Sequence, residues 1–197
     1  MEFKGFIDLI RIRQWYKNLV VFLPLIFSFL LFDENLFVRT FLAFVSLCFI
    51  SSANYIINDI VDRKNDVVHP EKKYRPIASG KISVISALFY SMIFFMLGSL
   101  IAYKLSMVFL FVVLILFFLN QVYSLLLKNE PFIDILIVAT NFVIRAISGV
   151  FVINRDISPW LILCPFFLAL FLIVGKRKSD LDFLKDDASK HKEVLKY

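Results

Sequence analysis

The chain has 197 residues, of which 60% are hydrophobic and 24 are Phe, and its mean hydropathy is +0.80. A water-soluble domain could not bury so much apolar surface, so the composition excludes an ordinary soluble fold and predicts an integral membrane protein. The net charge is +6, but the basic residues stand in short segments between apolar runs. This pattern is typical of membrane orientation, and we expect no nucleic-acid partner.

Six apolar runs follow one another along the chain, at residues 18–32, 36–57, 84–103, 106–127, 132–153 and 158–175. Most approach the ~20 apolar residues with which a helix crosses a bilayer. Long unbroken apolar runs indicate helices, because the strands of a membrane barrel alternate in polarity. No repeat or linker divides the chain. We therefore predict an all-α fold, a polytopic transmembrane helix bundle of six spans that forms a single membrane domain over 1–197.

The distribution of Lys and Arg predicts the orientation of the bundle. The N-terminus, the 58–83 connection, Lys128 and the tail from Lys176 together hold eighteen of the 22 basic residues, and they are alternate connections. The opposite connections hold only Arg39, Lys104 and Arg155. Because positive charge stays on the cytoplasmic side, we expect a multi-pass protein of the cell (inner) membrane whose N-terminus and charged loops are cytoplasmic.

The connection after the second run, NDIVDRKNDVVHPEKKYRPIASG (58–80), gathers acidic residues beside the membrane. Asn58, Asp62 and Asp66 are four residues apart, so a helix would place them on one face, with Asp59 one position round. Stacked carboxylates repel unless a cation lies between them. Mg²⁺ suits such a site, because it binds one or two carboxylates and completes its shell with substrate phosphate oxygens.

The basic residues that follow the aspartates in this connection, among them Lys73 and Arg75, would hold the rest of a diphosphate. The alternative interpretation is a solvated charged loop whose basic residues only enforce the orientation.

Arg145 lies near the middle of the fifth run, where a lipid-facing guanidinium costs at least ~2.5 kcal/mol. It should therefore face the bundle interior. Asp134 shares nearly the same helical face but lies about 16 Å along the axis, too far for a direct ion pair. We expect Arg145 to bind a substrate phosphate; the alternative is a structural role on a carbonyl or a polar neighbour.

Four stretches resemble a known family. Asn58-Asp59-x-x-Asp62-x-x-x-Asp66 with the RPIASG that begins at Arg75 is similar to the first aspartate-rich motif of the UbiA superfamily of intramembrane transferases. RIRQWYKNLVVFLPL (11–25), YSLLLKNEPFIDILIVATNFVIRAISG (123–149) and ALFLIVGKRKSDL (169–181) resemble its decaprenyl-phosphate phosphoribosyltransferase branch. The resemblance covers nearly the whole chain.

The chain departs from the family's pattern in two ways. Prenyl-transferring members share a second motif, Asp-x-x-x-Asp, but here Asp134 is followed four positions later by Val138. This counts against a prenyl diphosphate donor. The family has nine spans and this chain has six, so we expect the sequence to be incomplete at its C-terminus.

The resemblance implies an enzyme that moves 5-phosphoribose from phosphoribosyl diphosphate to a polyprenyl (decaprenyl) phosphate, with Mg²⁺ as cofactor and the site on the cytoplasmic side. It implies Asp62, Asp66 and Asp134 as catalytic residues and Asn58, Asp59, Asp62 and Asp66 as metal ligands. The expected substrate-binding residues are Arg13, Lys17, Lys73, Arg75, Tyr123, Lys128, Arg145, Lys176 and Arg177. Lys176 and Arg177 would hold the lipid phosphate, or would otherwise be interfacial anchors that keep their charges in the headgroup region.

Two other functions stay open. One is a prenyltransferase of the same superfamily, which attaches an isoprenoid to an aromatic or other acceptor. Its donor would be a polyprenyl diphosphate in place of phosphoribosyl diphosphate. The other is a transporter or a non-catalytic membrane protein, although transporters more often place ionisable residues at the midplane within broken helices. The sequence makes no prediction about oligomeric state.

Overall fold

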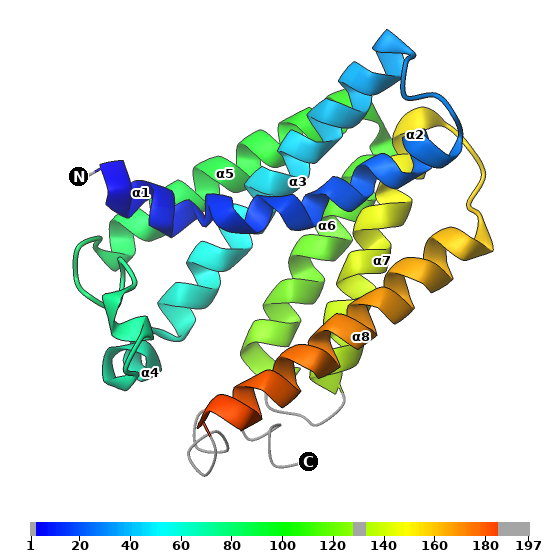
Figure 1. Ribbon diagram of the computed structural model, residues 1–197. Helices are drawn as coiled ribbons and strands as arrows, with labels where there is room; N and C mark the ends of the chain where they lie inside the picture. Colours follow the sequence, from blue (N-terminus) through cyan, green and yellow to red (C-terminus); the bar gives the residue numbers. More distant parts are fainter. Residues whose placement is uncertain (1–2, 128–132, 185–197) are drawn as a thin grey trace.

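The structure, a computed structural model, describes residues 3–127 and 133–184 (Figure 1). The elements in chain order are α1 (Phe3–Ile10), the 3₁₀ helix η1 (Ile12–Phe22), α2 (Leu23–Phe27), α3 (Glu34–Val61), α4 (Arg63–Val68), η2 (Lys72–Tyr74), α5 (Val84–Leu105), α6 (Met107–Val122), the π-helical turn η3 (Tyr123–Leu127), α7 (Ile133–Ile153) and α8 (Pro159–Leu184). No strand occurs in these two ranges. The all-α polytopic bundle is thus confirmed.

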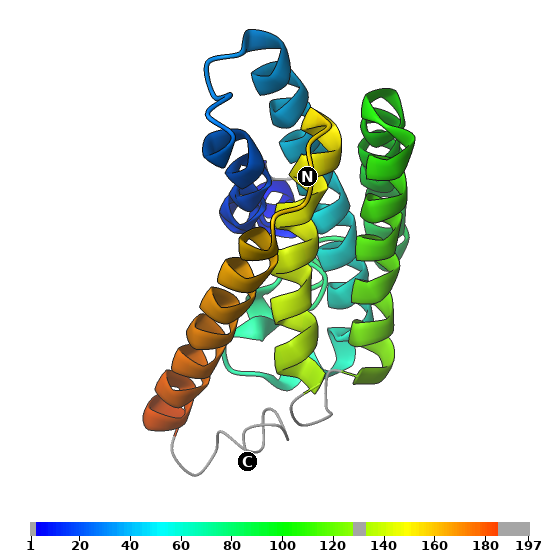
Figure 2. The same ribbon diagram turned by 90° about the vertical axis from the view of Figure 1, so that its right-hand side faces the viewer.

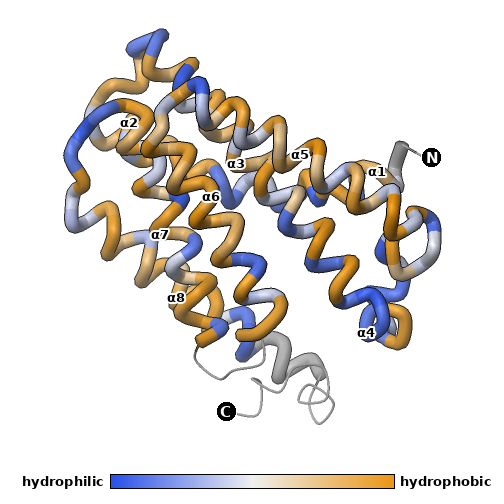
Figure 3. The backbone as a smooth tube through the Cα atoms, turned by 180° about the vertical axis from the view of Figure 1, so that it is seen from behind, coloured by the Kyte–Doolittle hydropathy of each residue, from blue (hydrophilic) through white to orange (hydrophobic). Residues whose placement is uncertain are grey.

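Five helices are long and apolar enough to cross a membrane: Glu34–Val61, Val84–Leu105, Met107–Leu127, Ile133–Ile153 and Pro159–Lys178. They correspond to the second to sixth predicted spans. α3 and α7 are the most buried of the five. Figure 2 shows α5 and α6 on one side of these two helices and α8 on the other. Most of the apolar residues in Figure 3 lie along these long helices, while α4 is largely hydrophilic.

The first predicted span, 18–32, is not a single membrane-length helix, which corrects the expectation of six. The N-terminal segment instead forms α1, η1 and α2 in succession and lies across the bundle in Figure 1. Arg11 adopts a left-handed conformation (φ 51°) between α1 and η1, and Phe29 does so (φ 58°) after α2. η1 has 11 residues and α2 has 5, so neither reaches the ~20 residues with which an α-helix crosses a bilayer.

Polar side chains fasten this N-terminal segment to α3. The Trp15 indole donates to Ser52 Oγ (3.1 Å), Ser52 donates to the Ile10 carbonyl (2.8 Å), and Ser51 donates to Asn18 Oδ1 (3.3 Å). Each bond satisfies a polar group that would otherwise be left without a partner at the contact of the two segments. The N-terminal segment is therefore packed against α3.

α3 and α5 approach closely because small residues line their contact. A Cβ atom on Gly98 would lie 2.8 Å from Ile50 Cγ1 and 3.0 Å from the Ser46 carbonyl oxygen. Ser46 Oγ also donates to the Gly98 carbonyl at 2.8 Å. Small residues commonly allow such close backbone approach between membrane helices. At the far end, Arg39 joins three helices by donating to Leu105 O (3.0 Å) and Val152 O (3.3 Å).

α3, α6 and α8 end, and α4 and α7 begin, at one common end of the bundle, which we call the charged end (Figure 1). The start of the 58–83 connection, the end of α6 with the start of α7, and the end of α8 therefore share one end of the bundle.

Candidate functional site

The predicted acidic face forms where α3 passes into α4. Asp62 N donates to Asn58 O and Asp66 N donates to Asp62 O, both at 2.9 Å, so helical spacing continues across the junction. Asp59 and Asp66 are only 2% and 3% exposed. Two buried carboxylates this close are costly unless cations compensate them.

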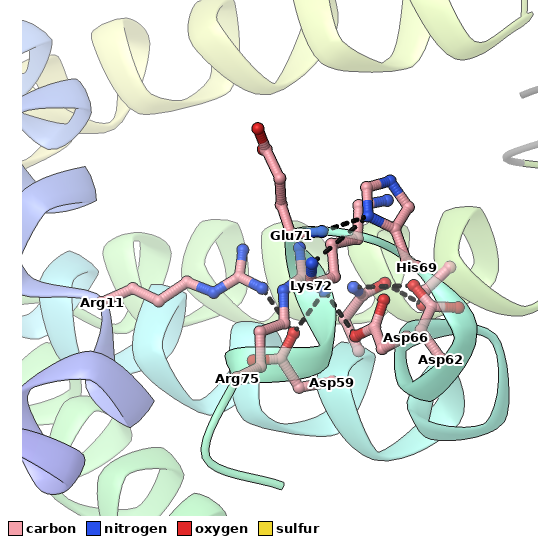
Figure 4. A network of polar contacts seen from close by, with 10 residues as sticks. Arg11, Asp59, Asp62, Asp66, His69, Glu71, Lys72 and Arg75 are labelled. Atoms are coloured by element: carbon pink, nitrogen blue, oxygen red, sulfur yellow. Dashed lines mark hydrogen bonds and ion pairs between the residues drawn. The ribbon is translucent and has the colours of Figure 1, made fainter. Parts of the chain in front are cut away.

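Arginines supply that compensation (Figure 4). Arg75 Nη1 lies 3.1 Å from Asp59 Oδ1 and 2.7 Å from Asp66 Oδ2. Arg11 forms a second ion pair with Asp59, and its guanidinium stands 4.9 Å from the centre of the Tyr55 ring. Sequence reasoning did not single out Arg11, which is 48 residues from its partner. Within the described ranges, no three His, Cys, Asp or Glu residues are grouped closely enough to hold a metal ion by themselves.

Asp62 stands apart from these arginine pairs. It accepts a hydrogen bond from Asn58 Nδ2 at 3.1 Å, and Ser124 Oγ in turn donates to Asn58 Oδ1 at 2.6 Å. His69 shapes the following loop, because its Nδ1 accepts from the backbone amides of Glu71 (3.1 Å) and Lys72 (3.2 Å). Asn58, Asp62 and Asp66 therefore offer side-chain oxygen atoms at helical spacing along the α3–α4 junction, and Asp66 also pairs with Arg75.

A second polar group joins α6, α7 and α8 at the same end. The buried carboxylate of Asp134 accepts from the Tyr123 hydroxyl on one oxygen and from Arg177 Nη2 on the other. Tyr123 and Arg177, both predicted to touch substrate, each hold the Asp134 carboxylate in this structure. Asp134 was predicted to share a helical face with Arg145. Its carboxylate belongs to this group with Tyr123 and Arg177, which is separate from the contacts of Arg145.

Arg145 is 8% exposed in the middle of α7. Its Nη1 donates to the Asn141 carbonyl at 3.3 Å, one turn back on the same helix, and its guanidinium lies 5.9 Å from the centre of the Phe142 ring. In the described part of the chain, its Nε has no hydrogen-bond partner. A guanidinium so deeply buried with an open donor is suited to an anion.

Lys17 on η1 lies within reach of the charge on Arg145. Burial first, and then the cations Arg145, Lys176 and Arg11, lower the pKa of its ammonium to about 8. Cations from the α1–η1 segment, α7 and α8 therefore act on Lys17 together. Lys176 itself is exposed at the charged end of α8.

Two of the predicted substrate residues that the structure describes, Arg13 and Lys73, do not join these groups. Arg13 and Lys73 are exposed, and the Lys73 ammonium lies 5.2 Å from the Tyr74 ring centre. Lys128 lies outside the described residues.

A mostly apolar cavity of about 670 Å³ lies between α2, α7 and α8. Phe142, which carries the Arg145 guanidinium over its ring, is one of its walls, and Arg155, Asp156 and Ser158 line it near the opposite end of the bundle. One wall of the cavity thus lies beside the Arg145 guanidinium, and other walls follow α8.

These features define a class: a polytopic helical membrane protein with a buried polar site at one end of its bundle and an apolar cavity beside it. The chain belongs to the UbiA prenyltransferase family, which residues 20–195 match. The family resemblance of its motifs is therefore confirmed.

Two relatives and one solved structure illustrate the similarity. The chain is 31% identical over 195 residues to the decaprenyl-phosphate phosphoribosyltransferase of Mycolicibacterium smegmatis, covering 97% of this chain and 61% of that protein. It is 33% identical over 187 residues to the enzyme of the same name from Corynebacterium glutamicum, covering 90% and 54%. A UbiA homolog from Archaeoglobus fulgidus bound to DMAPP and Mg²⁺ superposes with a TM-score of 0.79 at 22% identity, covering 97% of this chain and 69% of the other. The chain thus spans about three fifths of the length of the Mycolicibacterium smegmatis enzyme.

Proposed function

We propose that the protein acts as an integral membrane transferase that moves 5-phosphoribose from phosphoribosyl diphosphate to a polyprenyl phosphate, with Mg²⁺, at a cytoplasmic active site. One observation carries this proposal: a carboxylate group lies at the α3–α4 junction, and the buried Arg145 stands deeper in the same bundle, with Lys17 within reach of its charge. A donor with a diphosphate at one end and a phosphate at the other needs both. The relatives named as phosphoribosyltransferases favour the same donor.

The residues at the junction fit Mg²⁺ in their chemistry. Asp62, Asp66 and Asn58 offer only oxygen ligands, and this ion binds one or two carboxylates together with substrate phosphate oxygens. The absence of a three-carboxylate cluster among the described residues agrees with a metal that enters with its diphosphate. When bound, Mg²⁺ would neutralise the charge that develops on the leaving diphosphate.

The cations would bind the other end of the donor. Arg145 presents its open Nε, and Lys17 adds an ammonium from η1. A guanidinium binds two phosphate oxygens in a fixed geometry, so the pair would fix the 5-phosphate and orient the sugar. Lys176, at the charged end of α8, is placed for the acceptor phosphate.

The reaction then needs little proton transfer. The bond between the anomeric carbon and the diphosphate oxygen breaks, and the electron pair leaves with the diphosphate. An acceptor phosphate oxygen forms the new bond to that carbon. Because this oxygen is already ionised, no general base is required, and the protein contributes positioning and charge stabilisation. Arg75, already bound to Asp66, would lie beside the departing diphosphate.

The apolar cavity would take the first isoprene units of the acceptor. One of its walls, Phe142, lies beside Arg145, so a lipid phosphate near Arg145 would direct its chain along α8. An apolar chain gains about 0.8 kcal/mol for each CH₂ group that it buries.

A prenyl diphosphate donor is the second candidate, because the Archaeoglobus fulgidus homolog of similar fold is bound to DMAPP and Mg²⁺. That chemistry would use the same Mg²⁺–diphosphate group. It would leave the buried Arg145 without a phosphate to bind unless the acceptor were anionic.

Membranes that contain the complete gene product should be incubated with labelled phosphoribosyl diphosphate and polyprenyl phosphate, with and without Mg²⁺. The proposal predicts label in the lipid extract only with Mg²⁺, and none with Asp62→Asn. A parallel reaction uses labelled prenyl diphosphate with an aromatic acceptor. Transfer in that reaction alone would favour the second candidate, and no transfer in either would favour a non-catalytic protein.

A further inference from the structure

Two hydrogen-bonded groups, one ending at Asp134 and the other at Asp62, meet at the consecutive residues Tyr123 and Ser124 of η3. Arg177 and Tyr123 both donate to Asp134, Ser124 next to Tyr123 donates to Asn58, and Asn58 donates to Asp62. The two groups together extend from α8 through α7 and η3 to the α3–α4 junction. We call these six residues the relay.

The π-helical turn η3 makes this connection possible. A π turn changes the direction of consecutive side chains relative to an α-helix, and such turns are frequent at functional sites. Here it allows Tyr123 to reach α7 while Ser124, its neighbour, reaches α3 and is itself buried. Because the Tyr123 hydroxyl is held by Asp134, the turn is fixed in the position that presents Ser124 to Asn58.

The Asn58 amide bridges Ser124 and Asp62. Ser124 Oγ donates to Asn58 Oδ1 at 2.6 Å, and Asn58 Nδ2 donates to Asp62 Oδ2 at 3.1 Å, the orientation that a carboxylate requires because it only accepts. A rotated amide would point its oxygen at the carboxylate and repel it. The Ser124 hydroxyl therefore acts on Asp62 only through Asn58, whose amide it holds in the place from which Nδ2 reaches the carboxylate.

We propose that Tyr123, Ser124 and Asp134 are positioning residues, and that they act through Asn58 to orient Asp62 for a divalent cation. This rests on the proposed function for the role of Asp62. It assigns Asp134 a task other than that of a catalytic carboxylate, and it gives Tyr123 a task other than binding the sugar. It also gives a reason why Arg177 pairs with the buried Asp134 carboxylate.

The test uses three variants of the complete gene product in detergent. Ser124→Ala and Tyr123→Phe each remove one hydroxyl of the relay, and Ser124→Thr keeps a hydroxyl at the same place. The matched control is Ser91→Ala, because Ser91 is also buried and donates across a helix pair, to the Ala53 carbonyl at 3.1 Å, away from the relay. It should lower the melting temperature as a lost hydrogen bond does, with no effect on the cation.

Binding of Mn²⁺ in the presence of phosphoribosyl diphosphate is measured from the signal of free Mn²⁺ in electron paramagnetic resonance, which needs no turnover. We expect Ser124→Ala and Tyr123→Phe to weaken Mn²⁺ binding by about fivefold each, the factor expected for one hydrogen bond. Ser124→Thr should restore it, and Ser91→Ala should match the unmodified protein. The Mg²⁺ concentration for half-maximal transfer should follow the same order.

Equal Mn²⁺ affinity in Ser124→Ala and Ser91→Ala would overturn the positioning role. If the Mn²⁺ affinities of the variants follow this order but the unmodified protein transfers no phosphoribose, the positioning role is supported and the proposed function is overturned. If the unmodified protein binds no Mn²⁺, both are overturned.

Discussion

Arg75 illustrates how one side chain permits two buried carboxylates at the charged end. Asp59 and Asp66 are almost fully buried, and the Arg75 guanidinium lies within 3.1 Å of both. Removing one partner of a buried ion pair leaves an uncompensated charge, which costs several kcal/mol. The RPIASG stretch thus first stabilises the acidic junction, and its proposed contact with a diphosphate comes second.

Lys17 gives a prediction at the residue scale. Its pKa is lowered to about 8 by burial and then by Arg145, Lys176 and Arg11, so in the folded protein it loses its proton as the pH rises through 8. Phosphate binding needs the charged form, and the KM for phosphoribosyl diphosphate should therefore rise above that pH. Lys17→Arg keeps its charge, so this alkaline rise should disappear across about pH 6.5 to 9.5.

Over the same pH range the affinity for phosphoribosyl diphosphate should fall, whereas the folding stability should rise. Between pH 8 and 10.5 the unfolded chain keeps the Lys17 proton while the folded chain releases it, so stability rises with pH. A loss of binding above pH 8 is therefore not unfolding, which the melting temperature checks. If KM rises above pH 8 in Lys17→Arg as it does in the unmodified protein, Lys17 is not a group that binds the donor phosphate.

At the scale of elements, the close contact between the N-terminal segment and α7 depends on Gly149. A Cβ atom there would lie 2.1 Å from the Val21 carbonyl oxygen and 3.2 Å from Pro24 Cγ. The carbonyl cannot move aside as a side chain could, so Gly149→Ala must separate η1 from α7. We expect it to cost roughly 1–3 kcal/mol of stability, measured as a lower melting temperature in detergent.

Gly175→Ala on α8 is the matched control, because nothing lies within 4 Å of its added carbon and Ala favours a helix. Gly149→Ala should also weaken donor binding, since Lys17 and Arg145 lie on the two elements that it separates. A melting temperature equal to that of Gly175→Ala would contradict this packing.

The elements also show what sequence reasoning can reach. Apolar length alone located α3, α5, α6, α7 and α8, because each run exceeds what a soluble helix buries, and the i, i+4 spacing located the acidic face. The first span failed because a left-handed Arg11 and a 3₁₀ segment depend on contacts with α3 and α7. The relay could not be read either, since Ser124 and Asn58 are 66 residues apart and nothing in YSLLL indicates a π turn.

At the scale of the whole molecule, the orientation in the membrane decides which substrates reach the charged end. We predict that this end is cytoplasmic, because alternate connections carry eighteen of the 22 basic residues. A cysteine introduced at the exposed Lys73 should react with an impermeant reagent only after cells are permeabilised. Arg155→Cys, at the opposite end, is the matched control and should react in intact cells. The reverse pattern would contradict the orientation and the soluble donor with it.

The central claim is that the acidic junction and the buried Arg145, with Lys17, bind the two ends of one donor. The most direct measurement is equilibrium binding of labelled phosphoribosyl diphosphate to the purified protein, with and without Mg²⁺, in Asp62→Asn and Arg145→Gln. We predict saturable binding that requires Mg²⁺ in the unmodified protein, with a loss of at least about tenfold in affinity in each variant at an unchanged melting temperature. Binding that is independent of Mg²⁺, or that neither variant weakens, would contradict the account.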